Sequence, residues 1–108
     1  MVDITDSGHS YELSIDGEVV ARCDYRDAGH RRVFTHTEVD AAHTGQGLAT
    51  TLIEYALNDC RTQGMRIVAR CPMVSSYLGK HNDFADLVDT PAGVDAPEPE
   101  PGQTPERR

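Results

Sequence analysis

No run of apolar residues in this sequence is long enough to cross a bilayer, and no positively charged, apolar leader begins it. The sequence also has no Cys-x-x-Cys pair, because its three cysteines are far apart: Cys23, Cys60 and Cys71. Such spacing builds neither a disulfide framework nor a four-ligand zinc site. We therefore expect a cytoplasmic protein with free thiols, no bound metal and no membrane partner.

Positively charged residues are scarce: 10 lysines and arginines stand against 18 aspartates and glutamates, for a net charge of −8. An acidic surface repels the phosphates of nucleic acids and attracts cationic partners. We therefore expect no nucleic-acid partner. A nucleotide-binding fold is also disfavoured, because no P-loop lysine follows the glycines at 45 and 47 and no acidic residue is convincingly placed for a ribose.

The chain is short, with 108 residues, and its last part has no apolar periodicity. Five of its six prolines lie in residues 89–108, among glycine, glutamate and aspartate. This composition predicts a disordered, acidic, proline-rich tail. Residues 1–88 are then expected to form one compact domain with a modest core.

The N-terminal part predicts an antiparallel meander. Residues 1–8 are expected to be frayed, residues 11–15 alternate as a strand, and Asp16-Gly17 is a hairpin signal. Further strands are expected at 19–25 and 32–39, with a turn at 27–30. Alternation in the last strand predicts one face with Phe34, His36 and Glu38, which is either a cleft or a solvated face. The opposite face, expected to pack on the core, has Val33, Thr35, Thr37 and Val39.

A glycine-rich turn follows this strand and begins a helix expected to reach residue 63. Glycines allow a tight turn and a close approach of the backbone, and the first N–H groups of a helix attract anions. The segment therefore predicts a phosphate or pyrophosphate site, although such turns also occur for steric reasons alone. Its residues are His43, Thr44, Gly45, Gln46, Gly47, Leu48 and Ala49.

The second half of the domain predicts a β-α-β crossover. Apolar residues recur with helical spacing from Leu48 to Cys60, and Gly64 is expected to end the helix. A strand at 65–70 then lies parallel to the strand at 32–39. Pro72 is suited to the first turn of a second helix that reaches about residue 81. Residues 84–88 form a last, mainly apolar segment that is either helix or strand.

Two side chains near this second helix are candidate reactive groups. Cys71 ends a parallel strand ahead of a helix, where a thiolate is stabilised; it is either reactive or a small residue that fills the junction. Tyr77 is either a proton donor or a packing residue.

Three blocks in this order resemble the small, single-domain branch of the GNAT (GCN5-related) N-acetyltransferase superfamily. They are residues 34–39, residues 45–49, and Cys71-Pro72 with Tyr77 and Lys80-His81. The resemblance covers residues 11–88. It implies an α+β fold, in which a mixed sheet combines the meander with splayed parallel central strands and two main helices. It also implies acetyl-CoA as cosubstrate and no metal.

The resemblance assigns residues to cosubstrate binding. The pantetheine arm pairs with backbone around Glu38 and Val39, and Lys80 either neutralises a CoA phosphate or is merely solvated. Thr44 stands where the family usually has arginine or glutamine, which predicts weaker binding. The pyrophosphate rests on the amides of Thr44, Gly45, Gln46, Gly47, Leu48 and Ala49.

The resemblance also implies catalytic roles. Glu38 is the expected base, with His36 as its substitute, and the Val39 amide is the oxyanion donor. Tyr77 is the expected acid. Cys71 is a candidate acetyl-carrying nucleophile, although direct transfer is preferred.

The expected function is transfer of an acetyl group from CoA to a primary amine, either a small amine or a lysine side chain. The alternative is a non-catalytic acyl-CoA-binding or sensing module that acts through a protein partner. Larger GNAT enzymes build the acceptor site with extra N-terminal helices, which are not expected in this sequence. The acceptor groove is then expected to come from a second subunit, as in a homodimer, or from a bound protein.

Overall fold

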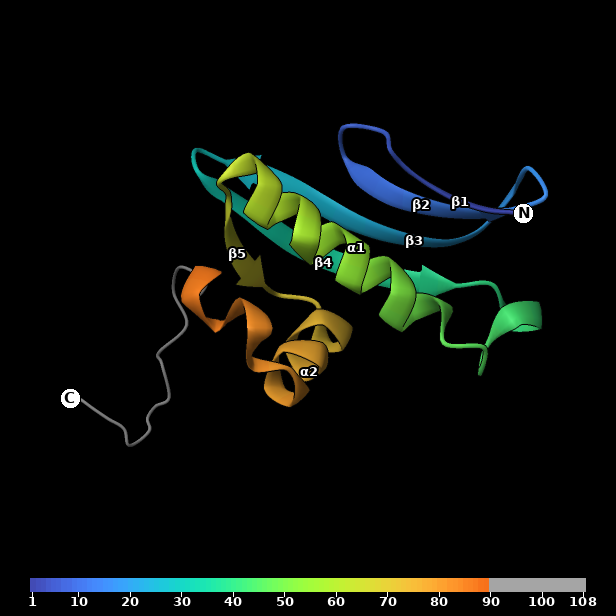
Figure 1. Ribbon diagram of the computed structural model, residues 1–108. Helices are drawn as coiled ribbons and strands as arrows, with labels where there is room; N and C mark the ends of the chain where they lie inside the picture. The colour runs from blue at the N-terminus through green and yellow to red at the C-terminus, as the bar shows by residue number, and fades with distance from the viewer. Residues whose placement is uncertain (90–108) are drawn as a thin grey trace.

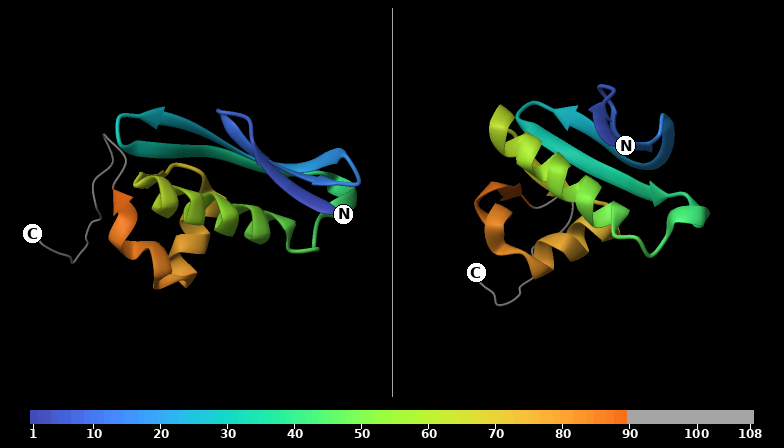
Figure 2. Two further views of the ribbon diagram at one scale, coloured as in Figure 1. Left: turned by 45° about the horizontal axis from the view of Figure 1, so that its top comes forward. Right: turned by 45° about the vertical axis from the view of Figure 1, so that its right-hand side comes forward.

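The computed structural model describes residues 1–89, whose six strands form one sheet in chain order (Figure 1). The antiparallel strands are β1 (Val2–Asp6), β2 (Ser10–Ile15), β3 (Glu18–Ala28) and β4 (Arg31–Val39). β5 (Arg66–Ala69) is parallel to β4, and β6 (Val88–Asp89) is parallel to β5. The helices lie together on one face of this sheet, as both views in Figure 2 show. The predicted α+β mixed sheet is therefore confirmed.

The helices follow the pattern expected from apolar spacing. α1 (Leu48–Gln63) buries Leu52, Ile53, Ala56, Leu57 and Cys60, and Gly64 ends it with φ at +71°. α2 (Pro72–Lys80) begins with Pro72, as predicted. Two 3₁₀ helices complete the fold, η1 (Ala41–His43) and η2 (Asn82–Leu87). Residues 84–88, whose secondary structure the sequence left open, thus form the end of η2 and the start of β6. No helix among residues 1–89 is both long and apolar enough to span a membrane.

Two predictions about the ends of the domain are wrong. The first residues are not frayed, because β1 pairs with β2 from Val2 opposite Ile15 to Asp6 opposite Tyr11. Asp89 is not part of a disordered tail: it lies in β6 and pairs with Arg31 at 2.9 Å and Arg66 at 2.8 Å. Hydrogen bonds from these arginines lower the Asp89 pKa to about 2. The rest of the expected tail lies outside the described residues.

A β-bulge in β4 corrects the predicted faces of that strand. Asp24 pairs with His36 and Tyr25 with Phe34, so Thr35 is an extra residue without a partner on β3. Phe34 therefore lies in the core under the helices, whereas His36 and Glu38 are exposed. The expected common face of Phe34, His36 and Glu38 is wrong for this reason.

The same bulge separates the four residues that were expected to share the core-packing face of β4, namely Val33, Thr35, Thr37 and Val39. Thr37 is buried and Val39 packs against the core, as predicted. Thr35 is exposed. Val33 is buried beside Val68 of β5 but is not part of the helix-covered core. Strict alternation thus holds only on each side of the extra residue.

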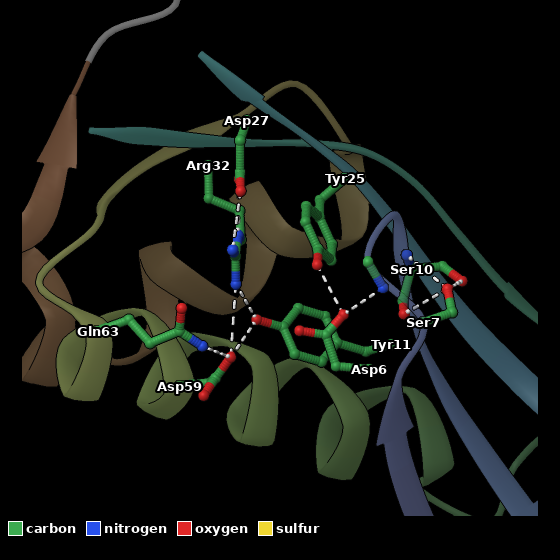
Figure 3. Close-up of polar contacts among 10 residues, drawn as sticks. Asp6, Ser7, Ser10, Tyr11, Tyr25, Asp27, Arg32, Asp59 and Gln63 are labelled. Carbon is green, nitrogen blue, oxygen red and sulfur yellow. Dashed lines mark hydrogen bonds and ion pairs between the residues drawn. The ribbon is translucent and has the colours of Figure 1, made fainter. Parts of the chain in front are cut away.

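A buried arginine, which the sequence did not single out, joins the meander to α1 (Figure 3). Arg32 of β4 is 5% exposed and makes a bidentate pair with Asp27 at 2.8 and 2.9 Å. Its other nitrogen donates to the Tyr11 hydroxyl, which donates to Asp59 of α1 at 2.6 Å. The guanidinium also lies 4.2 Å from the centre of the Tyr25 ring. These hydrogen bonds, that to Asp27 first, raise the Arg32 pKa and keep its charge permanent.

We expect Arg32→Met to lower the free energy of unfolding by about 2–3 kcal/mol, because it removes the charge-assisted hydrogen bonds of a buried guanidinium to Asp27, which is 42% exposed, and to the buried Tyr11 hydroxyl. Arg31→Met is the matched control: Arg31 is the preceding residue of β4, is 60% exposed and pairs with Asp89. Its loss should change stability by about 1 kcal/mol or less. Urea unfolding of both variants measures the difference. Equal effects would contradict a dominant role for the buried network.

Stability should also fall in alkali. Burial raises the pKa of the Cys23 thiol to about 11 and that of Cys60 to about 12. Unfolded thiols ionise near pH 8.5, so their contribution to stability is complete below about pH 8.5 and is lost progressively as the pH rises toward 11–12. Urea midpoints should therefore be lower at pH 10 than at pH 8. Cys60→Ala should reduce this pH dependence, and an unchanged midpoint between the two pH values would contradict it.

Candidate active site

β4 and β5 separate at Phe34, and this fork is the centre of the candidate site. The last paired residues are Phe34 and Ala69. The Phe34 carbonyl then accepts two hydrogen bonds, from the N–H of Arg70 at 3.0 Å and from that of Cys71 at 2.9 Å. The chain turns away into α2 at Pro72, whereas β4 continues to Val39. Residues 35–39 thus have an edge that no other described strand covers.

The orientation of the backbone at the end of β4 follows from one hydrogen bond. The Asp40 N–H donates to the Val20 carbonyl of β3 at 2.7 Å. Because successive peptide groups of a strand point to opposite edges, the Val39 N–H points away from β3 and toward the fork. The predicted oxyanion donor is therefore on the uncovered edge.

The glycine-rich turn lies between η1 and α1. Gly45 and Gly47 have φ of +81° and +75°, which favours glycine at both positions. The first helical bond runs from the Thr51 N–H to the Gly47 carbonyl at 3.1 Å. The N–H groups of residues 48–50 precede this bond and have no partner within the helix. The steric and the anion-binding explanations of this turn are therefore compatible.

Thr44 and Gln46 are exposed in this turn. The Thr44 hydroxyl donates to the Ala41 carbonyl at 3.2 Å, so this side chain is bonded within the loop.

A groove of about 330 Å³ lies between α1 and α2. Tyr77 is buried at its wall, and its ring stacks on the His81 ring at 4.2 Å between centres. Burial, and then the carboxylates of Glu54 and Asp83, raise the Tyr77 pKa, which keeps the phenol protonated. Lys80 also lines the groove. The other lining residues are Ala49, Thr50, Ile53, Pro72, Met73, Ser76 and His81.

A second groove, of about 440 Å³, lies at the ends of β3 and β4. It is lined by residues 19–22 and 38–41, including Val39 and Asp40. Glu38 is 57% exposed there and pairs with Arg22 at 3.1 Å. His36, two residues earlier on the same strand, is exposed on the same face.

The structure thus divides the four predicted catalytic residues between two faces of the sheet. Glu38 and His36 project from the face without helices, whereas Cys71 and Tyr77 belong to the core under the helices. Cys71 is only 2% exposed. Its sulfur lies 3.2 Å from the Thr37 hydroxyl, which is itself 3.5 Å from the Cys23 sulfur.

The sequence did not single out Thr37 or Cys23 as neighbours of Cys71. The register of the β3–β4 hairpin, with its bulge, places Cys23 opposite Thr37. Counting back from the turn at residues 29–30 without the bulge shifts this pairing by one residue. No group of three or more metal-binding side chains gathers within residues 1–89.

Comparisons with known proteins agree with this fold. A family model described as GCN5-related N-acetyl-transferase matches residues 10–87. A GCN5-like protein from Staphylococcus aureus, solved by NMR, has a TM-score of 0.66 at 18% identity. That similarity covers 89% of this chain and 96% of the other. None of the curated proteins matches.

Two enzymes are more distantly similar. The ribosomal-protein-S18-alanine N-acetyltransferase from Escherichia coli has a TM-score of 0.52 at 17% identity, over 58% of this chain and 42% of that one. The ribosomal-protein-alanine N-acetyltransferase from Brucella melitensis biovar Abortus 2308 has a TM-score of 0.53 at 17% identity, over 80% of this chain and 66% of that one. This chain therefore spans less than half of the first enzyme and about two thirds of the second. At these identities the likeness shows the fold alone.

The family model covers most of the described domain, and the resemblance inferred from the three sequence blocks is thereby confirmed. The chain belongs to the GCN5-related N-acetyltransferase family.

Proposed function

We propose that this protein is an acetyl-CoA-dependent N-acetyltransferase that moves an acetyl group to a primary amine. The observation that carries the proposal is the uncovered edge of β4 at residues 35–39, opposite the end of β5. An extended chain with amide groups can pair with such an edge as an added strand does. The pantetheine arm of CoA has this character, and the fork leaves a position for it beside Val39.

The glycine-rich turn supplies the anion-binding part of the proposal. In this proposal the pyrophosphate accepts hydrogen bonds from the backbone amides of the turn and of the first helical turn, where the N–H groups of residues 48–50 have no partner within α1. Lys80, on the wall of the groove between α1 and α2, adds a cation for a phosphate of CoA. Thr44 contributes a short side chain where the family usually has a long one, so we expect weaker cosubstrate binding.

The two faces of the sheet suggest separate approaches for the two substrates. In this proposal acetyl-CoA lies on the helix side, at the glycine-rich turn and the groove between α1 and α2. Glu38 and His36 face the other side, so the amine approaches from the face without helices. The two meet at the edge of β4, where the Val39 N–H is available to the oxyanion formed when the amine attacks the thioester carbonyl.

Proton transfers complete the proposed reaction. Glu38, held by Arg22, takes the ammonium proton of the acceptor, directly or through water, and His36 is its substitute. Tyr77, which burial keeps protonated, gives a proton to the departing CoA thiolate. Direct transfer is preferred over an acetyl-Cys71 intermediate, because the Cys71 sulfur is buried and already in contact with Thr37.

The acceptor classes to test are small amines, lysine side chains and the N-terminal amine of alanine peptides. The last is included because two structural neighbours are named as alanine N-acetyltransferases. The alternative function is an acyl-CoA-binding module whose acceptor surface belongs to a partner. It is supported by the extent of the match to the E. coli enzyme, which covers only 42% of that protein.

We expect acetyl-CoA at about 100 times its dissociation constant to stabilise the protein by about 2.7 kcal/mol, and ADP much less. Thermal unfolding measures both. Gly47→Asp should abolish the acetyl-CoA effect by placing a carboxylate at the phosphate position. Gly29→Asp is the matched control, since Gly29 also has a positive φ, +64°, and lies in the distant β3–β4 turn. Aspartate tolerates this conformation. No stabilisation of the parent protein at millimolar acetyl-CoA would end the enzyme proposal.

We expect Glu38→Gln to reduce amine-dependent release of CoA by about 10²–10⁴-fold while the acetyl-CoA thermal shift is retained. Asp24→Asn is the control, because Asp24 binds the same Arg22, at 3.0 Å, but has no part in the proposed reaction. Binding of acetyl-CoA without CoA release for any acceptor class would favour the binding module instead.

A further inference from the structure

The groove at the ends of β3 and β4 contains charges of both signs. Arg22 of β3 and Glu38 of β4 are direct partners across the two strands, and their side chains form an ion pair at 3.1 Å. Both side chains are accessible, at 45% and 57% exposed. The volume of the groove, about 440 Å³, is within the range of about 300–1,000 Å³ that is typical of sites for small molecules. The groove therefore offers a small ligand both a guanidinium and a carboxylate.

Arg22 keeps hydrogen-bond donors that these contacts do not use. Its Nε donates to Asp24 at 3.0 Å, and its Nη2 pairs with Glu38 at 3.1 Å. A guanidinium has five N–H donors, and neither contact uses Nη1. Among the described residues that line the groove, Arg22 is the only cation. A carboxylate of a ligand thus has one partner here, and the planar guanidinium is well suited to bind it.

The same groove favours an ammonium group beside Arg22. Glu38 and Asp40 both line it, so two carboxylates stand against one guanidinium. Asp40 already accepts a hydrogen bond from the Ala42 N–H, at 3.3 Å, and caps η1. Glu38 pairs with Arg22 through Oε1, which leaves Oε2 for an ammonium. Glu38 is therefore the carboxylate that binds the amine, in agreement with its proposed role as base.

The wall of the groove also has an apolar part. Val19 is 50% exposed, and Ala41, which lines the same groove, is exposed as well. A ligand that covers these side chains removes apolar surface from water. The groove thus combines a carboxylate, a guanidinium and an apolar wall. A free α-amino acid has the complementary set, because its ammonium, its carboxylate and its side chain are attached to one carbon.

We propose that the acceptor is a free α-amino acid with an apolar side chain: its ammonium binds Glu38, its carboxylate binds Arg22, and its side chain covers Val19. This inference rests on the proposed acetyl transfer and selects one acceptor class for it. A lysine side chain or the N-terminus of a peptide brings an ammonium without a neighbouring carboxylate and leaves the Arg22 donors unused. A site built to pair with a substrate group discriminates against analogues that lack it.

The transfer uses the groups already described. The ammonium gives one proton to Glu38, and the neutral nitrogen forms a C–N bond to the thioester carbon, whose C–S bond breaks. CoA leaves as a thiolate and takes the Tyr77 proton. The second proton of the nitrogen restores Tyr77 through water, and Glu38 returns its proton to the solvent. The products are CoA, an N-acetyl amino acid and one proton.

The experiment compares L-leucine with L-leucinamide, which keeps the amine and the side chain but has no carboxylate. Release of CoA at saturating acetyl-CoA gives kcat/KM for each acceptor. Arg22→Gln should lower the ratio of the two values, leucine over leucinamide, by about 10- to 100-fold, because only leucine loses an ionic hydrogen bond. Weaker support of Glu38 would lower both values and leave the ratio unchanged. Arg26→Gln is the matched control and should keep the wild-type ratio, since Arg26 is an exposed residue of β3 outside the groove.

An unchanged ratio in Arg22→Gln, or transfer to a lysine peptide but not to leucine, would overturn the acceptor assignment and leave the proposed acetyl transfer standing. If acetyl-CoA binds but no acceptor releases CoA, the proposed enzyme function fails and binding tests the groove. The probe is then leucine, titrated against protein with ¹³C-methyl-labelled valine. We expect leucine to shift the Val19 methyl signals in the wild type and much less in Arg22→Gln. The absence of any such shift would overturn the assignment.

Discussion

The buried guanidinium of Arg32 is the constraint on which the rest of this structure depends. A permanent charge in the core is tolerated only when its donors are satisfied, and its partners come from different elements. Asp27 belongs to β3, Tyr11 to β2 and Asp59 to α1. The orientation of α1 across the meander is thereby specified. The same helix has the glycine-rich turn at its other end, so the network in the core also positions the turn that we propose as the anion-binding part of the site.

Two irregularities of β4 then create the site itself. The extra residue at Thr35 turns His36 and Glu38 to the face without helices, while Thr37 stays in the core. The Phe34 carbonyl accepts both the Arg70 and the Cys71 N–H groups and ends the pairing with β5. A regular strand with a full-length partner would leave no free edge for a ligand. The bulge and the fork together place an open backbone edge between a solvated carboxylate and a buried thiol.

The division between faces has a chemical consequence. On the open face, water screens the Glu38–Arg22 pair and leaves the carboxylate accessible for proton transfer. On the covered face, burial raises the pKa values of Tyr77 and of the Cys23 thiol, which keeps both groups protonated. β4 thus separates a solvated face from a desolvated face, and the proposed reaction assigns the amine to the first and the thioester to the second.

The sequence by itself determined the elements whose signals are local. Period-two alternation and Asp16-Gly17 specified the β2–β3 hairpin, and helical spacing with Gly64 and Pro72 specified α1 and the start of α2. The three blocks also sufficed to predict the family. Only the tertiary structure decided which residues of distant strands meet: β1 depends on β2, the Thr35 bulge depends on β3, and Asp89 depends on arginines of β4 and β5. The contacts of Arg32 and Thr37 likewise join residues far apart in the chain. Such pairings are set by packing and by the satisfaction of buried polar groups, which no local pattern of residues records.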